Sequence, residues 1–141
     1  MVDNLSREQR AYAMRRVKAQ DTLPEITVRK LLRTAGETGY RLHRKDLPGK
    51  PDIAFIGRKL AIFVHGCYWH GHDCARGKRV PKANSEYWIA KIAKNKARDC
   101  INKELLENSG WKILTIWECE IKSKTVLSER IYRFFQRSVL P

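Results

Sequence analysis

Three of the four histidines and two of the four cysteines of this chain lie within ten residues, His65-Gly66-Cys67-Tyr68-Trp69-His70-Gly71-His72-Asp73-Cys74. Such clustering of thiols and imidazoles is typical of a metal site. Cys67, His72 and Cys74 offer three soft or borderline donors that are close enough in the chain to bind one ion. A tetrahedral structural zinc needs a fourth ligand, for which the sequence offers Cys100 or Cys119.

The position of each remaining cysteine decides between them. Cys100 follows Ile89 by eleven residues, about three helical turns, so we expect both side chains to point into the core. Cys119 follows the last predicted strand and can turn towards the cluster, so we expect it to complete the site. Four protein ligands would make the zinc structural. Cysteines packed as small core residues, with histidines in solvent, are the alternative.

His65 and His70 are left over beside the expected zinc ligands and are candidates for catalysis. Asp52 follows Pro51 and opens an apolar strand, where a carboxylate needs a partner such as magnesium bound at a phosphodiester. Asp after Pro is also ordinary turn chemistry. Because a hairpin from Asp52 to Val64 returns the chain to its start, we expect the carboxylate and the histidines to share one edge of a sheet.

A histidine that acts as a general base is usually oriented by a carboxylate. Asp99 shares a polar stripe of a predicted helix with Trp88 and Asn95, and this stripe could face the metal edge. A surface ion pair with Lys96, Arg98 or Lys103 is the alternative. Glu25 is similarly ambiguous, because a carboxylate near a helix start also suits the helix dipole.

The chain carries 29 Lys and Arg against 15 Asp and Glu, a formal charge of +14. This charge predicts a nucleic-acid partner, with a solubilising coat as the alternative. Tyr68, Trp69 and Trp88 could then stack on bases or wedge between base pairs, or they could pack in a core.

The elements that must position these residues form a mixed α/β protein on a small sheet. The long central helix should bury a stripe of apolar residues at four-residue intervals, Ile89, Ala93, Ala97, Ile101 and Leu105. The patterning predicts one domain, residues 1 to 141, with these elements: a helical arm in residues 1 to 20, a helix from Asp21 or Thr22 to Gly36, strands Tyr40 to Arg44, Asp52 to Ile56 and Leu60 to Val64, a helix from Asn84 or Ser85 to Gly110, a strand Trp111 to Trp117 and a helix Val126 to Phe135.

No apolar run is long enough to span a bilayer, and Met1 to Gln20 lacks the apolar stretch of a secretory signal. We therefore expect a cytoplasmic protein without a membrane partner, whose cysteines are thiols or metal ligands.

These residues resemble a known family, the very short patch mismatch-repair endonucleases, which nick DNA beside T:G mismatches left by deamination of 5-methylcytosine. The His-Gly-Cys-aromatic-Trp-His block is highly specific to it, and the matching segments occur in family order over most of the chain: Asp21-Thr22-Leu23-Pro24-Glu25, Leu47-Pro48-Gly49-Lys50-Pro51-Asp52, Val64 to Cys74, Glu86-Tyr87-Trp88, Lys94-Asn95 with Arg98-Asp99, and Gly110-Trp111 with Trp117-Glu118-Cys119.

The resemblance implies a restriction-endonuclease-like core and roles for its residues. Asp52 and the main-chain carbonyl of Val64 would bind magnesium. His70 would be the base that activates water, held by Asp99, with His65 close to the scissile phosphate.

Further roles follow from the same resemblance. Glu25 would bond a water ligand of the magnesium ion, and Met14 in the N-terminal arm would clasp the DNA. Tyr68, Trp69 and Trp88 would form a wedge next to the mismatch. The structural zinc ligands would be Cys67, His72, Cys74 and Cys119.

The sequence thus predicts a magnesium-dependent nicking endonuclease for double-stranded DNA with a T:G mismatch. A bacterial, nucleoid-associated protein is expected, with mismatch-repair proteins as further partners. We expect it to be a monomer, because an asymmetric lesion offers no palindrome for a dimer to match. One rival is a similar nickase with different or no mismatch specificity. Another is a zinc-stabilised DNA-binding module without catalysis.

Overall fold

The computed structural model of the chain describes residues 22–67, 70–72, 74 and 83–139. Their elements follow the order helix α2 (Leu23–Thr34), strands β1 (Arg41–Leu42), β2 (Ile53–Phe55) and β3 (Leu60–His65), helix α3 (Ser85–Asn108), strand β4 (Lys112–Trp117), 3-10 helix η1 (Glu118–Lys122) and helix α4 (Lys124–Val139). The predicted N-terminal arm lies outside the described residues. The order of the other predicted elements is confirmed, and η1 is an addition.

Helix α2 begins where its sequence predicts. The hydroxyl of Thr22 accepts a hydrogen bond from the backbone N–H of Glu25 at 3.4 Å, and proline occupies the first turn. The helix buries Val28 and Leu32 on the side that faces the sheet. It therefore holds Glu25, one turn from its start, in a fixed and buried position.

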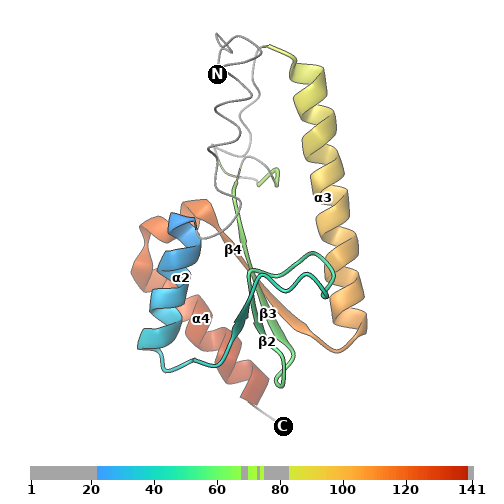
Figure 1. Cartoon of the computed structure of the whole chain (residues 1–141). Coiled ribbons are helices and arrows are strands. Elements are labelled where there is room, and N and C mark those ends of the chain that lie inside the picture. Colours follow the sequence, from blue (N-terminus) through green and yellow to red (C-terminus); the bar gives the residue numbers. More distant parts are fainter. Residues whose placement is uncertain (1–21, 68–69, 73, 75–82, 140–141) are drawn as a thin grey trace.

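The strands form one four-stranded sheet in the order β1-β2-β3-β4. Strands β1, β2 and β3 are antiparallel neighbours, whereas β4 pairs parallel to β3 in a register that places Trp117 opposite His65. A parallel neighbour needs a crossover, and α3 supplies it. The C-terminal ends of β3 and β4 therefore lie at the same edge of the sheet (Figure 1).

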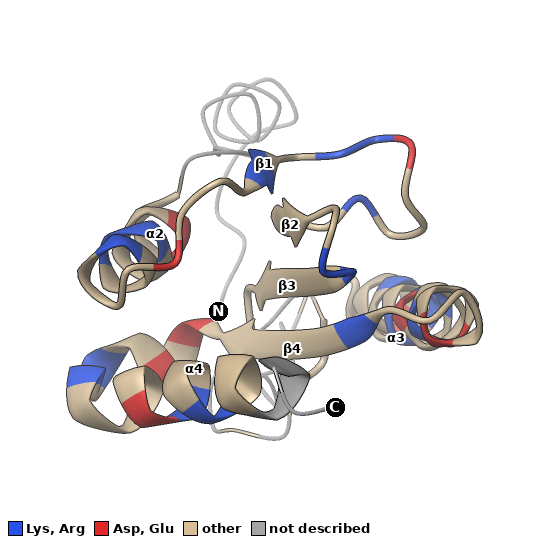
Figure 2. Cartoon of the chain, turned by 90° about the horizontal axis from the view of Figure 1, so that it is seen from below, with Lys and Arg blue, Asp and Glu red and all other residues tan. Residues whose placement is uncertain are grey.

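The two faces of the sheet carry different cores. Helices α2 and α4 cover one face and α3 lies against the other (Figure 2). Because side chains alternate along a strand, β3 sends Leu60 and Ile62 into the larger core under α2 and α4, and Ala61 and Phe63 into a smaller core with Leu106 of α3. His65 continues the second set and so lies on the α3 side.

The prediction that α3 buries an apolar stripe is wrong. Ile89, Ile101 and Leu105 are 55%, 57% and 50% exposed, and Cys100 is exposed too. The buried residue is Leu106, which lies about 100° around the helix from Leu105. Ala93 and Ala97 are also exposed. Only the last turns of α3 pack on the sheet, while its first half extends beyond the sheet edge (Figure 1).

Two element boundaries also differ from the prediction. Strand β1 comprises Arg41–Leu42 alone, because His43 has a left-handed backbone with φ of +48° and so leaves the extended conformation. Helix α4 begins before the predicted Val126 and continues past Phe135. The side chain of Arg130 in α4 ion-pairs with Glu120 and donates a hydrogen bond to the carbonyl of Thr115, which fixes α4 and η1 to β4.

Candidate metal and catalytic site

Four predicted zinc ligands come together at the shared end of β3 and β4. Donor atoms of Cys67, His72, Cys74 and Cys119 all lie within 4.8 Å of one another. The backbone N–H of Cys119 donates to the Cys67 sulfur at 3.3 Å, and Cys119 Sγ lies 3.6 Å from His72 Nδ1. Three sulfurs and one imidazole are a donor set that suits a closed, tetrahedral zinc site.

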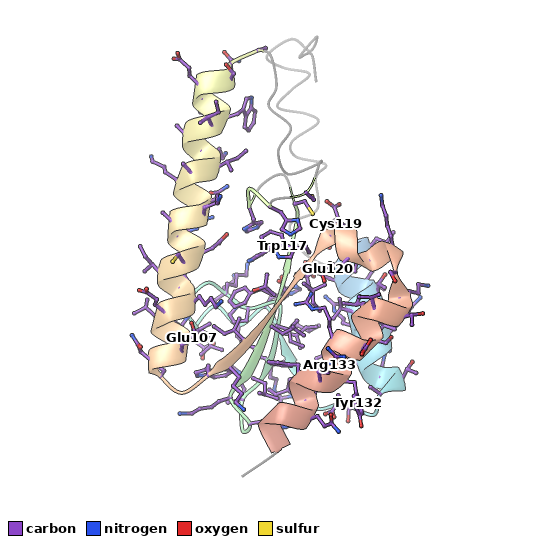
Figure 3. All side chains as sticks on the ribbon, turned by 180° about the vertical axis from the view of Figure 1, so that it is seen from behind. Glu107, Trp117, Cys119, Glu120, Tyr132 and Arg133 are labelled. Carbon is purple, nitrogen blue, oxygen red and sulfur yellow. The ribbon has the colours of Figure 1, made fainter. Side chains whose placement is uncertain are left out.

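The parallel pairing of β3 and β4 explains this convergence. Cys119 lies in η1 directly after β4 (Figure 3), and Cys67 follows β3, so the parallel pairing brings both cysteines to the same edge. The His72 ring stacks on Trp117, with ring centroids 4.2 Å apart. Burial raises the pKa of the Cys67 thiol to about 12, so a bound cation is needed to favour its thiolate.

A second cluster, His65, His70 and Asp99, lies beside the first. The Nδ1 atom of His70 is 2.6 Å from a carboxylate oxygen of Asp99, and the rings of His65 and His70 stack with centroids 3.7 Å apart. Burial, followed by the neighbouring His70, lowers the pKa of His65 to about 4, so its ring is neutral at pH 7. The cluster lines a cleft of about 400 Å³ between α3 and the sheet, together with Lys96 and Lys103.

Gly71 lets the histidine loop approach α3 closely. Its φ is +62°, and a Cβ there would lie 2.6 Å from Cδ of Lys96 and 2.9 Å from Cγ2 of Ile92. Another residue would therefore strain the loop and push it away from the helix. Gly71 was not predicted as a site residue, and its position between His70 and His72 is the signal that could have identified it.

Asp52 lies before β2, where its carboxylate accepts a hydrogen bond from the backbone N–H of Val64 at 2.7 Å. Burial raises the pKa of Asp52 to about 6, and the charge of Glu25 acts in the same direction. A cation at this carboxylate would offset both effects. The predicted hairpin therefore does bring Asp52 next to the end of β3.

Glu25 and His43 lie next to Asp52, and the three side chains form a third group whose ligand atoms are within 4.8 Å of one another. Glu25 is only 3% exposed. Its Oε2 atom lies 3.0 Å from His43 Nε2 and accepts a hydrogen bond from Arg29 Nη2 at 3.2 Å. His43 was missed by the sequence analysis, because it stands alone among basic residues, away from the other histidines.

The residues predicted to bind DNA are described only in part. Met14, Tyr68 and Trp69 lie outside the described residues. Trp88 is half-buried in the first turn of α3, its ring 5.1 Å from that of Tyr87. Basic residues are spread over α2, α3, α4 and the loop between β1 and β2 (Figure 2). Within the described residues, no helix is long and apolar enough to cross a membrane.

Comparison with known proteins gives consistent results. The family model described as "DNA mismatch endonuclease Vsr" matches residues 2–76. The chain is 47% identical over 131 residues to "Type II nicking enzyme V.XorIIP" of Xanthomonas oryzae pv. oryzae, covering 93% of this chain and 95% of that protein. It is 35% identical over 129 residues to "DNA mismatch endonuclease Vsr" of Escherichia coli K12, covering 92% of this chain and 81% of that protein.

Among solved structures, the chain resembles the catalytic domain of the homing endonuclease I-Bth0305I. The TM-score is 0.53 at 22% sequence identity, and the match covers 85% of this chain and all of that domain. This likeness, with the mixed four-stranded sheet and its flanking helices, confirms the predicted restriction-endonuclease-like fold.

Proposed function

Because this chain belongs to the Vsr family of DNA endonucleases, we propose that it nicks one strand of duplex DNA beside a T:G mismatch, with magnesium as its catalytic ion. The observation that carries the proposal is the hydrogen bond between His70 and Asp99 beside the stacked ring of His65, in one cleft. Asp52 accepts a hydrogen bond from the N–H of Val64, the residue that precedes His65. A base, its orienting carboxylate and a cation-binding carboxylate are the groups that hydrolysis of a phosphodiester needs.

The hydrogen bond to Asp99 determines what His70 can do. With Nδ1 donating its proton to the carboxylate, Nε2 carries the lone pair that takes a proton from the attacking water. The negative charge of Asp99 then stabilises the imidazolium that forms. His65, neutral at pH 7, can donate a hydrogen bond to a phosphate oxygen without repelling the protonated His70.

Asp52 is the carboxylate that would hold magnesium, with the carbonyl of Val64 as a further ligand and Glu25 nearby. The ion supplies positive charge that offsets the charge developing on the phosphate. Lys96 and Lys103, which line the cleft, add positive charge for the DNA backbone. The sulfur-rich cluster of Cys67, His72, Cys74 and Cys119 would bind zinc and hold the histidine loop in place.

The mismatch specificity is supported by the relation to the Escherichia coli enzyme, whose name describes a DNA mismatch endonuclease. A second candidate function is favoured by the other relatives. Five of the similar proteins, from four further genera, are named type II nicking enzymes, including those of Xanthomonas oryzae and Neisseria meningitidis. A nickase that accompanies a restriction system, with its own sequence context, therefore remains the rival.

A nicking assay separates the two candidates. End-labelled duplexes that differ only in one T:G or T:A pair, embedded in randomised flanks, are incubated with the protein and magnesium. We expect cleavage of one strand beside T:G and none with EDTA, and the cleaved pool gives the sequence context. Equal cleavage of both duplexes would leave a nickase without mismatch specificity. Cleavage by the H70A variant at the wild-type rate would overturn the mechanism.

A further inference from the structure

His43 places a nitrogen donor beside the two carboxylates of the proposed magnesium site. Its Nε2 atom is 3.0 Å from Oε2 of Glu25, and one ligand atom each of His43, Glu25 and Asp52 lie within 4.8 Å of one another. Two ligands on adjacent corners of an octahedron, each about 2.1 Å from the ion, are themselves about 3 Å apart. We infer that His43 Nε2 is a direct ligand of the catalytic cation, which makes this a mixed nitrogen and oxygen site.

The backbone places the His43 ring in this position. His43 adopts a left-handed conformation, and its N–H donates to the carbonyl of Asp52 at 3.2 Å, so the end of β1 is fixed to the start of β2. The ring thereby turns inward. The side chain of His43 is only 14% exposed, and that of Glu25 is 4% exposed. A left-handed non-glycine residue is uncommon, and here it aims an imidazole at two buried carboxylates.

The geometry allows two roles for His43, and they use different forms of the ring. A hydrogen bond to Glu25 requires a proton on Nε2, whereas ligation of a cation requires the lone pair of Nε2. On ligation the neutral ring carries its proton on Nδ1 instead, so no net proton is gained or lost. Detection of a nitrogen ligand on the bound cation would therefore separate ligation from simple positioning of Glu25.

An imidazole ligand changes which cations the site prefers. Magnesium favours oxygen ligands, whereas first-row transition ions bind imidazole well. The inference rests on the proposed function, because it takes the cation of the nuclease to bind at Asp52. It goes further in predicting that manganese binds this site more tightly than magnesium, by a margin that depends on His43.

The experiment uses the full-length protein with its zinc content measured, so that the sulfur-rich site is filled. Manganese binding is titrated by electron paramagnetic resonance, and electron spin-echo modulation detects nitrogen bonded to the ion. The wild type should show modulation from ¹⁴N that changes when histidine is labelled with ¹⁵N. H43Q, whose amide can still donate to Glu25, should lose the modulation and bind manganese about tenfold more weakly, with a smaller change for magnesium.

Three results would overturn the inference. The first is bound manganese without nitrogen modulation, and the second is modulation that persists in H43Q. In both cases the proposed function would stand if the D52N variant no longer binds manganese. The third is the absence of any manganese or magnesium binding, which would overturn the inference and the metal-dependent function together. Because labelling tags all four histidines, H43N serves as the second variant if H43Q does not fold.

Discussion

The Nδ1 atom of His70 lies 2.6 Å from Oδ2 of Asp99, although 29 residues separate them in the chain. The contact joins the loop after β3 to the polar side of α3. It fixes both the direction of the His70 ring and the nitrogen that is left to accept a proton. The loop can come this close because Gly71 has no side chain to meet Lys96 and Ile92 of α3.

We predict that replacing Asp99 with Asn lowers kcat for nicking by about 10²- to 10⁴-fold, since the amide no longer stabilises the protonated His70. KM and the free energy of unfolding should change little, because the two side chains are similar in size. D46N is the matched control, because Asp46 is exposed and pairs only with Arg44 among the described contacts. Wild-type kcat in D99N would remove Asp99 from the mechanism.

Removing one ligand should release the proposed zinc. We expect one zinc per wild-type chain by elemental analysis, and less than one in C119S, with a lower free energy of unfolding because the loops after β3 and β4 lose their common anchor. C100S should keep both its zinc and its stability, since Cys100 is exposed and outside the four-donor cluster. Equal zinc content in the two variants would argue against this site.

Ionisation of Asp52 should destabilise the protein in the absence of a divalent ion. Burial raises its pKa from an ordinary value of 3.8 to about 6. Below pH 3.8 the group is protonated in both states. Between pH 3.8 and 6 the unfolded chain loses this proton first, so the free energy of unfolding falls by about 3 kcal/mol as the pH rises. At pH 8, D52N should be more stable than the wild type by about this amount.

Urea denaturation of the wild type and D52N at pH 4 and pH 8, in magnesium-free buffer, checks this difference. Asn keeps an oxygen that can accept the hydrogen bond from Val64, so the variant tests the charge alone. Magnesium added at pH 8 should stabilise the wild type and not D52N. A stability difference that is the same at both pH values would contradict the buried-charge explanation.

Truncation of Leu105 and Leu106, which are neighbours in α3, should lower the free energy of unfolding by very different amounts. Leu106 is 1% exposed and packs with Phe63 and Trp111, so L106A should lower the free energy of unfolding by about 2–5 kcal/mol. Leu105 is 50% exposed, and L105A should change the free energy of unfolding by less than about 0.5 kcal/mol. Chemical denaturation of both variants measures this. A larger loss in L105A would mean that the apolar stripe is buried after all.

The sequence was sufficient for the strands and for the grouping of the four expected zinc ligands. Strands β2 and β3 are apolar on both sides because cores lie on both faces of the sheet, and such runs are easily recognised. The structure places Cys119 with the other three donors, but Cys100 is exposed and does not point into the core as expected. The roles of Asp52, His70 and Asp99 stay predictions.

The orientation of α3 and the position of His43 could not be read from the sequence. Apolar spacing along α3 predicts a buried stripe through Ile89 and Leu105. The helix instead directs Asp99 to the cleft and Leu106 to the sheet. Pattern rules assume that the apolar side faces the protein, and they fail where a functional cleft requires polar groups. His43 depends on one left-handed residue at a strand end, which no local pattern indicates.

The contact between Cys67 and Cys119 spans 52 residues and includes the whole of α3 and β4. A ribosome must therefore synthesise the chain through Cys119 before the sulfur-rich cluster can close. A prematurely terminated product that carries His65, His70 and Asp99 but ends before Lys112 lacks both β4 and the fourth donor. Incomplete copies of the endonuclease would thus be released without an assembled cleft, because Ile113, Thr115 and Trp117 of β4 form part of its wall.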